Sequence, residues 1–190
     1  MMMRKIIFLF LAFLCLDAYA QTTMRDMLKT MPDSLVPYLS ENNRLDMIDF
    51  VDTNMEAIVT NTLGGKSQMN KLTDNYVSIR LNESSDLAMR LLDVETPVDS
   101  ARQIVCVVTT YGTDIRESTI RFFSLSWKPL PMTDYLLLPD EMVVATIGDD
   151  DPTLTLQYEC RLNAPANEEQ KAISKPSTIL KWTGKYVKGD

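Results

Sequence analysis

The chain has 190 residues, of which 45% are hydrophobic and 24% charged, with 19 basic residues against 26 acidic ones and a formal net charge of −7. An acidic surface repels nucleic acid and anionic lipid, so neither is expected as a partner. The sequence contains no histidine, which excludes a Ser-His-Asp triad, a Cys-His dyad and a histidine-bound zinc.

The N-terminus has the pattern of a secretory signal peptide. Two basic residues precede an unbroken apolar run over 6–16, which is too short to span a bilayer. Ala18 and Ala20 then supply small residues at the two positions that a signal peptidase recognises. We therefore expect residues 1–20 to be removed near Ala20 and the protein to be exported, as a periplasmic or secreted protein.

A cleaved signal has two alternatives, of which lipidation is discounted. An uncleaved membrane anchor would use the same apolar run. Lipidation would need a small residue directly before Cys15, and that residue is Leu14. No later run is long and apolar enough to span a membrane. Residues 21–190 suit a single domain, and their net charge is −8 because two basic residues and one acidic residue leave with the signal.

Residues 21–65 are predicted to be the helical part of that domain. Thr22 and Thr23 can cap a short helix. Asn43 resembles the cap of a longer helix over about 44–63, whose apolar residues recur at helical spacing. These residues are Leu45, Ile48, Val51, Met55 and Ile58. Gly64-Gly65 is expected to end this helix.

Residues 66–190 are predicted to be mainly strands. Residues 76–81 alternate between polar and apolar, and 87–92 form a returning strand. The clearest pair is 103–110 and 119–127, which is apolar on both faces and joined by a polar turn with one glycine. This pattern indicates a β-hairpin that is covered on both sides.

The segments around this hairpin are less regular. Thr96-Pro97 and the proline-rich residues 127–131 are expected to break the chain on either side of it. Residues 141–147 fit either a strand or a helix. Residues 154–162 alternate as a strand, and a last small hairpin is expected about Gly184.

Helices followed by strands predict an α+β fold, with N-terminal helices packed on one face of a mainly antiparallel β-meander. The hairpin side chains that we expect to be buried are Val105, Val107, Phe122 and Phe123. The 44–63 helix is expected to cover one face of their sheet through Ile48, Val51 and Met55. The second face must be covered by the connection after Trp127, by the C-terminal segment or by a partner chain.

Two cysteines, Cys106 and Cys160, remain after removal of the signal. Both lie in predicted strands, where they can be buried thiols that pack as small hydrophobic side chains. An exported protein also permits a disulfide between them, which requires Cα atoms within about 7 Å. Both interpretations stay open.

Two segments resemble ion or phosphate sites. Asp149, Asp150 and Asp151 are weak candidates for a metal, because consecutive aspartates point different ways while calcium loops place ligands at alternate positions. Residues 64–67 resemble the end of a phosphate loop, but Thr60 stands where the motif needs another glycine. We therefore predict no cofactor and no specific zinc or calcium requirement.

Other residues are weaker functional candidates. Trp127 and Trp182 can bind sugar or protein, or pack in the core or at its rim. Glycoside hydrolysis needs a pair of carboxylates, and several acidic residues are available for it. These are Glu83, Asp114, Glu117, Glu141 and Glu159.

Residues 42–51, with Val59-Thr-Asn-Thr-Leu-Gly-Gly-Lys-Ser67 and Leu72-Thr-Asp-Asn-Tyr76, resemble a family of exported proteins of unknown function from Bacteroidales. The resemblance extends over most of residues 21–190. It implies export from a Gram-negative bacterium and carries over no active site.

The sequence therefore predicts an exported, non-enzymatic binding or accessory domain whose partner is a protein or an envelope component. A carboxylate-dependent hydrolase acting on glycan or peptidoglycan is the alternative. An enzyme would need a concave pocket with two carboxylates, whereas a binding module would show an apolar patch or an open sheet edge.

Overall fold

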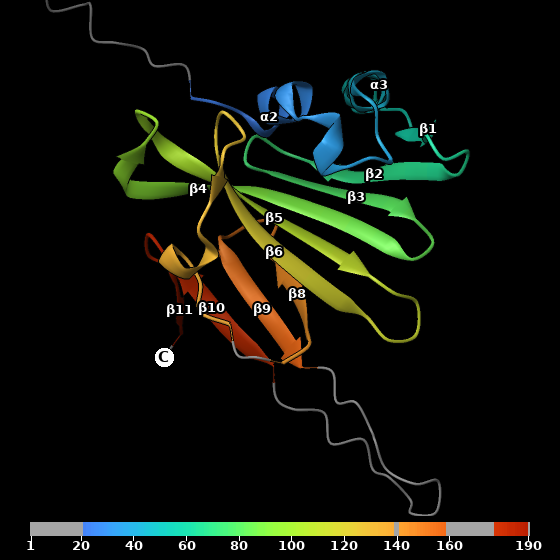
Figure 1. Cartoon of the computed structure of the whole chain (residues 1–190). Helices are drawn as coiled ribbons and strands as arrows, with labels where there is room; N and C mark the ends of the chain where they lie inside the picture. The colour runs from blue at the N-terminus through green and yellow to red at the C-terminus, as the bar shows by residue number, and fades with distance from the viewer. Residues whose placement is uncertain (1–20, 139–140, 159–176, 190) are drawn as a thin grey trace, which may run out of the picture.

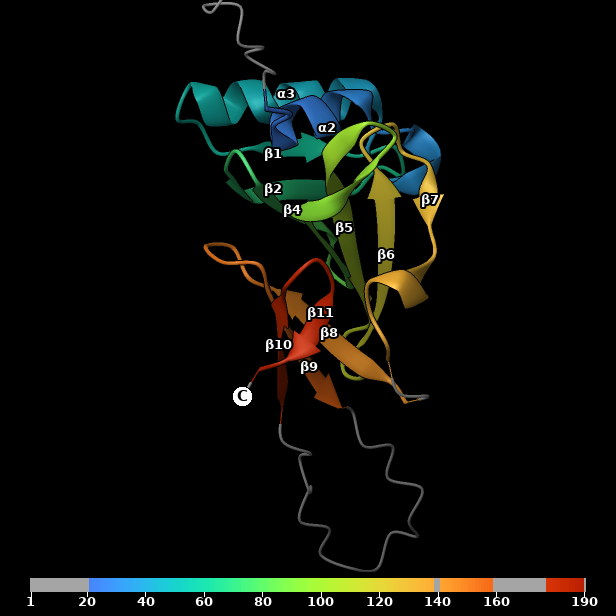
Figure 2. The ribbon, with the colours of Figure 1, turned by 90° about the vertical axis from the view of Figure 1, so that its left-hand side faces the viewer.

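The computed structural model of the protein describes residues 21–138, 141–158 and 177–189. These residues form three layers, which Figure 2 shows edge-on: short helices, a seven-stranded sheet and a four-stranded sheet. Every strand pair in both sheets is antiparallel. The predicted α+β class, with N-terminal helices on a mainly antiparallel meander, is confirmed.

The helical layer contains α2 (Met24–Thr30), the 3₁₀ turn η1 (Asp33–Leu35) and α3 (Glu41–Asp52). The seven-stranded sheet keeps chain order, as Figure 1 shows, with β1 (Ile58–Thr60), β2 (Lys66–Leu72), β3 (Tyr76–Asn82), β4 (Ser85–Val98), β5 (Ala101–Tyr111), β6 (Glu117–Ser124) and β7 (Pro129–Leu130). A second 3₁₀ turn, η2 (Met132–Asp134), leads to the four-stranded sheet. Its order is β11-β10-β9-β8, with β8 (Val143–Ile147), β9 (Thr153–Tyr158), β10 (Thr178–Trp182) and β11 (Tyr186–Lys188).

The predicted central hairpin is formed by β5 and β6, and both of its faces are buried. Val105, Val107 and Phe123 pack on the helical side. Phe122 points to the other side, where the four-stranded sheet covers it. Exposure of these four side chains is 4% or less, so the predicted core positions are confirmed. Of the three covers considered for the second face, the C-terminal segment supplies the largest part.

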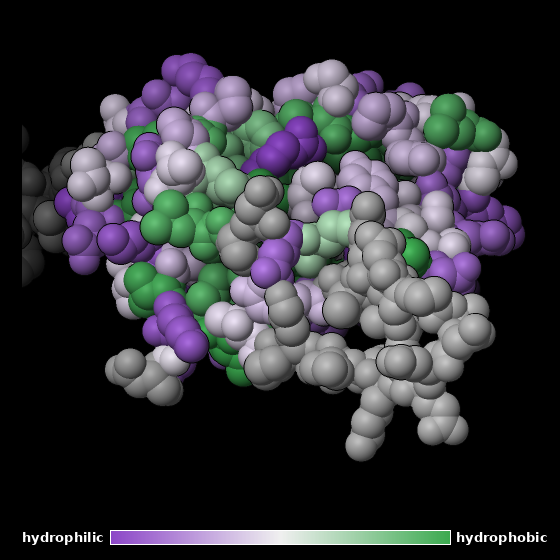
Figure 3. All heavy atoms as spheres, turned by 60° about the horizontal axis from the view of Figure 1, so that its bottom comes forward, coloured by the Kyte–Doolittle hydropathy of each residue, from purple (hydrophilic) through white to green (hydrophobic). Residues whose placement is uncertain are grey.

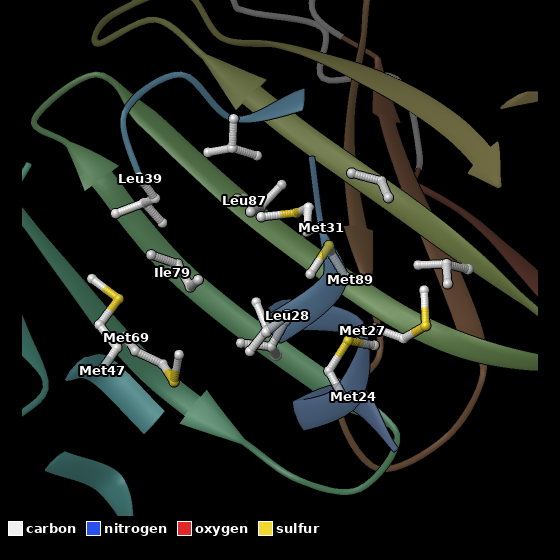
Figure 4. Close-up of a cluster of buried hydrophobic side chains, with 14 of the residues drawn as sticks. Met24, Met27, Leu28, Met31, Leu39, Met47, Met69, Ile79, Leu87 and Met89 are labelled. Atoms are coloured by element: carbon white, nitrogen blue, oxygen red, sulfur yellow. The ribbon is translucent and has the colours of Figure 1, made fainter. Parts of the chain in front are cut away.

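Methionines and leucines fill the space between the helices and the seven-stranded sheet (Figure 4). The side chains of Met24, Met27 and Leu28 from α2 are buried there. Thr23 caps α2 as predicted, in a capping box with Asp26. The apolar face of α2 therefore anchors the first helix directly on the sheet.

The predicted 44–63 helix is wrong at both ends. Ser40 is the N-cap of α3, and Asn43 completes its capping box from the third helical position. The helix stops at Asp52 because Asn54 adopts a left-handed conformation with φ of 56°. The main-chain N–H groups of Asn54 and Met55 then bond back to the last turn as in a Schellman motif. This turn leads the chain out of the helix.

Because α3 ends early, some of the residues predicted to face the core from this helix do not do so. Ile48 is buried and Val51 is partly buried against the core, as expected. Met55 is 59% exposed and does not cover the sheet, so that expectation is wrong. Ile58 belongs to β1, the edge strand beside β2.

Gly64-Gly65 forms the turn between β1 and β2 and does not end a helix, so this prediction is also wrong. Gly64 has a φ of +83°, which glycine adopts without strain. The Asn61 side-chain oxygen accepts hydrogen bonds from the N–H groups of Leu63 and Gly65 and closes the turn. Residues 64–67 therefore lack the strand-to-helix setting of a phosphate loop.

The expected break at Thr96-Pro97 is absent. Strand β4 continues to Val98, and Pro97 is tolerated inside a register irregularity between Asp93 and Val98. The turn follows at Asp99-Ser100, where both residues have positive φ, as a two-residue type I′ hairpin turn requires. Residues 143–147, which fitted strand or helix, are strand β8.

Arg44 in α3 is 1% exposed and holds the helical layer together. Its guanidinium donates to the carbonyls of Leu28, Met31 and Leu39 at 2.6–2.8 Å and to the Asp33 carboxylate at 2.7 Å. These carbonyls lie at the end of α2 and in the connection to α3. One side chain therefore satisfies main-chain acceptors that have no partner within a helix at this point.

We predict that Arg44→Met lowers the free energy of unfolding by about 3–5 kcal/mol, because it leaves buried carbonyls without donors. Urea unfolding measures the loss. Arg102→Met, at an exposed position on β5, is the control and should leave stability nearly unchanged. Equal effects of the two substitutions would show that Arg44 does not organise this layer.

Candidate functional site

A groove lies between strand β8 and the face of the seven-stranded sheet that points away from the helices. Its floor comes from β2, β3 and β4, including Asn70, Ser78 and Asp86, and residues 144–147 of β8 form one wall. The cavity measures about 240 Å³, less than the roughly 300–1,000 Å³ typical of small-molecule sites. We call it the β8 groove. Its size suits a few side chains of an extended chain better than a cofactor.

The wall of the groove is a sheet edge, because β8 is the outermost strand of the four-stranded sheet. Gly148 N–H bonds to Thr153 of the neighbouring strand, whereas Ala145 N–H points away and donates to the Ser118 hydroxyl at 2.9 Å. By strand alternation, the main-chain groups of Ile147 also point outward. In the described part of the chain these Ile147 groups have no hydrogen-bond partner. Ile147 as a whole is 2% exposed, so these unpaired main-chain groups border the groove and not bulk solvent.

The floor of the groove is polar because the four-stranded sheet does not extend over β2 and β3, so this face of the two strands is not part of the core. Arg116, from the turn between β5 and β6, forms an ion pair with Asp86. Tyr76, at the inner end, is 7% exposed, and burial raises the pKa of its hydroxyl. Asp86 is the only carboxylate among the described residues that line this groove.

The turn at 148–152 docks the end of β8 on the seven-stranded sheet. Arg90 donates to the carbonyls of Gly148 at 2.8 Å and Asp150 at 3.3 Å, and Lys71 pairs with the Asp149 carboxylate. A Cβ at Gly148 would lie 2.6 Å from the Asp151 carbonyl, so the turn needs glycine there. This turn was predicted, and its aspartates serve to attach one sheet to the other.

The three aspartates of this turn have separate partners. The hydrogen bond from Lys71 holds the pKa of Asp149 below its usual value. Asp151 accepts hydrogen bonds from the side chain and N–H of Thr153, and the side-chain bond is the main cause of its lowered pKa. Asp150 is 92% exposed at its side chain, 3.4 Å from Lys71. Within residues 21–138, 141–158 and 177–189, no group of three or more histidine, cysteine, aspartate or glutamate side chains is arranged to hold a metal ion.

Three buried side chains with polar atoms lie between the two sheets. Arg90 and Tyr186 are 7% and 6% exposed, and Cys106, which pairs with Arg90 in the β4–β5 register, is fully buried. The Tyr186 hydroxyl and the Arg90 Nε have no hydrogen-bond partner within the described residues. Burial raises the pKa of the Tyr186 hydroxyl and of the Cys106 thiol, so both groups are neutral here.

Cys160, the other half of the possible disulfide, lies outside the described residues. Cys106 points into the space between the sheets, beside Phe122 of the adjacent strand. Burial of Cys106 agrees with its expected place in a core strand. A bridge between Cys106 and Cys160 therefore stays a prediction.

The remaining candidate residues do not converge on one site. Glu83, Asp114, Glu117 and Glu141 are all exposed, and none of them lines the groove. Glu159 lies outside the described residues. The structure thus offers the hydrolase interpretation no pair of carboxylates from this set within the β8 groove.

Both tryptophans take part in packing. Trp127 packs on Phe123 and donates its indole N–H to Thr30 at 3.2 Å, which ties the β6–β7 turn to α2. Trp182 donates to the Asp93 carbonyl at 2.6 Å and stacks in an aromatic cluster with Phe122 and neighbouring rings. The core interpretation holds for Trp127, and Trp182 is half-buried.

Two larger cavities lie next to parts of the chain that the structure does not describe. One, of about 530 Å³, is lined by the segment after η2 and by β9 to β11, and the other, of about 610 Å³, by the β4–β5 turn and residues 21–22. Figure 3 views the molecule from the side of the four-stranded sheet and shows hydrophobic and hydrophilic residues interleaved there. Leu137 and Ile179 are exposed by 80% and 52%. The β8 groove is the candidate site, because a sheet edge with unpaired main-chain groups forms its wall.

The sequence did not point to the residues that build this groove. Lys71, Arg90 and Arg116 received no role, although a single arginine between Ala88 and Leu92 on one strand face is an unusual buried charge. Such a charge on an apolar face signals a partner across the core. The other polar floor residues follow ordinary strand alternation and carry no separate signal.

We predict that Tyr186→Phe leaves stability at pH 7 unchanged or raises it by up to about 1 kcal/mol, because it removes a buried hydroxyl without a partner. An unfolded tyrosine ionises near pH 10, whereas burial raises the pKa of Tyr186 in the folded protein. The folded state thus keeps a proton that the unfolded state releases. Its stability is intact below about pH 10 and falls as the pH rises further.

The variant should therefore lose less stability than the wild type between pH 7 and about pH 10.5, as urea unfolding at both values would show. Cys106 is present in both proteins, so its own titration cancels in the difference. A loss above about 1 kcal/mol at pH 7 would instead mean that a bound molecule satisfies the hydroxyl.

A family model described as "Protein of unknown function (DUF3256)" matches residues 16–164. No curated protein matches the chain. A solved domain of an uncharacterized protein from Porphyromonas gingivalis W83, a member of the Bacteroidales, has a TM-score of 0.73 and 18% identity, with 87% of this chain and 97% of that chain covered. At this identity the likeness shows the fold alone. The expected membership of an uncharacterised family is confirmed by the family model, which covers more than half of the sequence: the chain belongs to the DUF3256 family of proteins of unknown function.

Proposed function

We propose that this protein is a non-enzymatic binding domain that holds an extended segment of a partner protein along the free edge of β8. The observation that carries the proposal is the outward-facing main chain of Ile147, which borders a groove instead of bulk solvent. An extended segment pairs with such an edge through main-chain hydrogen bonds, and pockets beside the edge receive its alternate side chains.

The surroundings of β8 support strand addition. The Ser118 hydroxyl accepts a hydrogen bond from the outward N–H of Ala145 and is itself hydrogen-bonded to Thr110 at 2.7 Å. This end of the β8 edge is therefore closed to a partner. The arginine and lysine contacts to the 148–152 turn fix the other end of β8 in place. The free edge between them is short and rigid. It therefore costs little ordering entropy when a partner binds.

The groove offers less to a hydrolase. Among the described lining residues Asp86 is the one carboxylate, and it is ion-paired with Arg116, whereas glycoside hydrolysis needs two carboxylates. In the second of the larger cavities, Asp93 accepts from Gln103, and a hydrogen bond from Lys128 chiefly lowers the pKa of Asp99. A carboxylate whose pKa is lowered, as that of Asp99 is, does not fit the acid role in glycoside hydrolysis.

We further propose that the domain works outside the cytoplasm, as a periplasmic or secreted protein released by cleavage near Ala20. The pattern of residues 1–20 supports this location. These residues lie outside the described part of the structure. In the part that is described, no helix is long and apolar enough to cross a membrane.

Hydrogen exchange of the free protein tests the edge. Thr146 N–H lies in the β8–β9 ladder and is expected to exchange slowly, whereas the outward Ile147 N–H should exchange at least about tenfold faster. Two-dimensional NMR in deuterated buffer resolves the two amides. If both exchange at the same slow rate, the edge is already occupied and strand addition is wrong.

A photo-reactive amino acid at Thr146, which borders the groove, tests binding in cells that make the protein. The control position is Gln157, an exposed residue of the same sheet that pairs with Val144 and lies on β9, a strand with a neighbour on each side. We expect a discrete adduct from position 146 and none from position 157. The same adducts from both positions would contradict the proposal, and an adduct of twice the chain mass would make a second copy the occupant.

A further inference from the structure

The floor of the β8 groove continues outward along β2 and β3 as a polar sheet face with two exposed cations. Arg80 lies two residues from the groove residue Ser78 on the same face of β3, and Gln68 is its register partner on β2. Lys66, two residues before Gln68, shares that face. Both basic side chains are exposed. Neither has an ion pair or hydrogen bond to any described residue.

Two carboxylates lie beside these cations, and two more lie at the far end of the groove. Asp86, directly across from Arg80 in the β3–β4 register, is held by Arg116. Glu56 accepts a hydrogen bond from Gln68 at 3.3 Å. At the far end of the groove, Asp149 and Asp150 are paired with Lys71. On this outer floor Lys66, Arg80 and Arg116 thus stand against two carboxylates, those of Asp86 and Glu56. The result is an excess of one positive charge, in a chain whose formal net charge is −7.

The charged face lies next to the floor beneath the edge of β8, so it can interact with a segment bound at that edge. Residues of β3 and β4 form the floor directly below that edge, and Arg116 reaches the floor from the β5–β6 turn. A strand added to β8 would turn alternate side chains toward this floor. Polar and charged side chains on the floor would select what those alternate positions carry.

We propose that the extended segment bound in the β8 groove is acidic, with aspartate or glutamate at the alternate positions that face Arg80 and Lys66. This inference rests on the proposed strand addition and specifies its partner. Complementary charge would raise the rate of encounter and fix the register of the segment. A nucleic acid or another polyanion could use the cations, but it has no use for the main-chain groups of Ile147.

Fluorescent ten-residue peptides with alternating threonine provide the test, measured by fluorescence anisotropy against residues 21–190. One peptide carries glutamate at every second position, one glutamine and one lysine. We expect the glutamate peptide to bind about tenfold more tightly than the glutamine peptide at low salt, and the lysine peptide not to bind. The preference should shrink at about 0.5 M salt.

The double variant Lys66→Gln with Arg80→Gln should reduce the preference for glutamate over glutamine to less than about twofold. Arg121→Gln is the matched control, because Arg121 is an exposed arginine on the opposite face of the same sheet. It should leave the preference intact. A glutamate preference that survives the double variant would overturn the assignment of these cations.

A second arm separates this inference from the proposed function. A glutamate peptide with N-methylated threonines cannot donate main-chain hydrogen bonds from those positions and should lose binding. If all three peptides bind equally and N-methylation abolishes binding, strand addition stands and the acidic preference falls. If N-methylation has no effect, or dextran sulfate binds with the same dependence on Arg80, the face attracts polyanions and both proposals fall. Absence of binding by every peptide also overturns the acidic segment.

Discussion

The constraint on which this structure depends is that the β5–β6 hairpin is apolar on both faces. A strand pair of this kind is stable only when both faces are removed from water, and each large side chain contributes about 1.5–3 kcal/mol when it is buried. Val105 and Phe123 require a layer on one side, and Cys106 and Phe122 require one on the other. The three-layer architecture follows: helices from the N-terminal part of the chain cover one face, and a sheet from the C-terminal part covers the other.

Each cover is fixed by an arginine that is almost fully buried. On the helical side, short helices expose main-chain carbonyls where they end, and Arg44 satisfies those carbonyls from within the layer. On the opposite side, Arg90 performs the same task for the carbonyls of the 148–152 turn and so fixes the second sheet. In both cases the arginine binds main-chain oxygens, whose place depends on the local turn. Lysine, with a single ammonium group, cannot match such a spread of acceptors.

The parts that could be predicted from sequence are those in which one physical signal dominates. Strong apolar character gave the hairpin and its burial, and the Thr23 cap and the turn about Gly184 follow from local chemistry. Errors arose where two signals compete. Apolar residues continue at helical spacing through Met55, but the Schellman motif at Asn54 ends the helix first. Proline at 97 suggests a break, yet the irregular register of β4 absorbs it. Arg44 and the groove escaped prediction because their roles arise from contacts between segments distant in the sequence.

The groove itself is a consequence of unequal sheet sizes. Seven strands lie in one sheet and four in the other, so the smaller sheet cannot cover β2 and β3, and these strands are polar on the uncovered face. The edge strand of the smaller sheet, β8, therefore has a free edge that lies above the polar floor. Proteins normally protect such an edge with a bulge, a charge or a covering segment. Here Ser118 protects one outward position of β8, while the main-chain groups of Ile147 border a groove and have no hydrogen-bond partner among the residues that the structure describes. An edge that is partly closed and rigidly held can accept one short segment in one register, whereas a fully open edge would pair with any exposed strand. This selective closure is why the arrangement fits a binding site better than an unprotected end of a sheet.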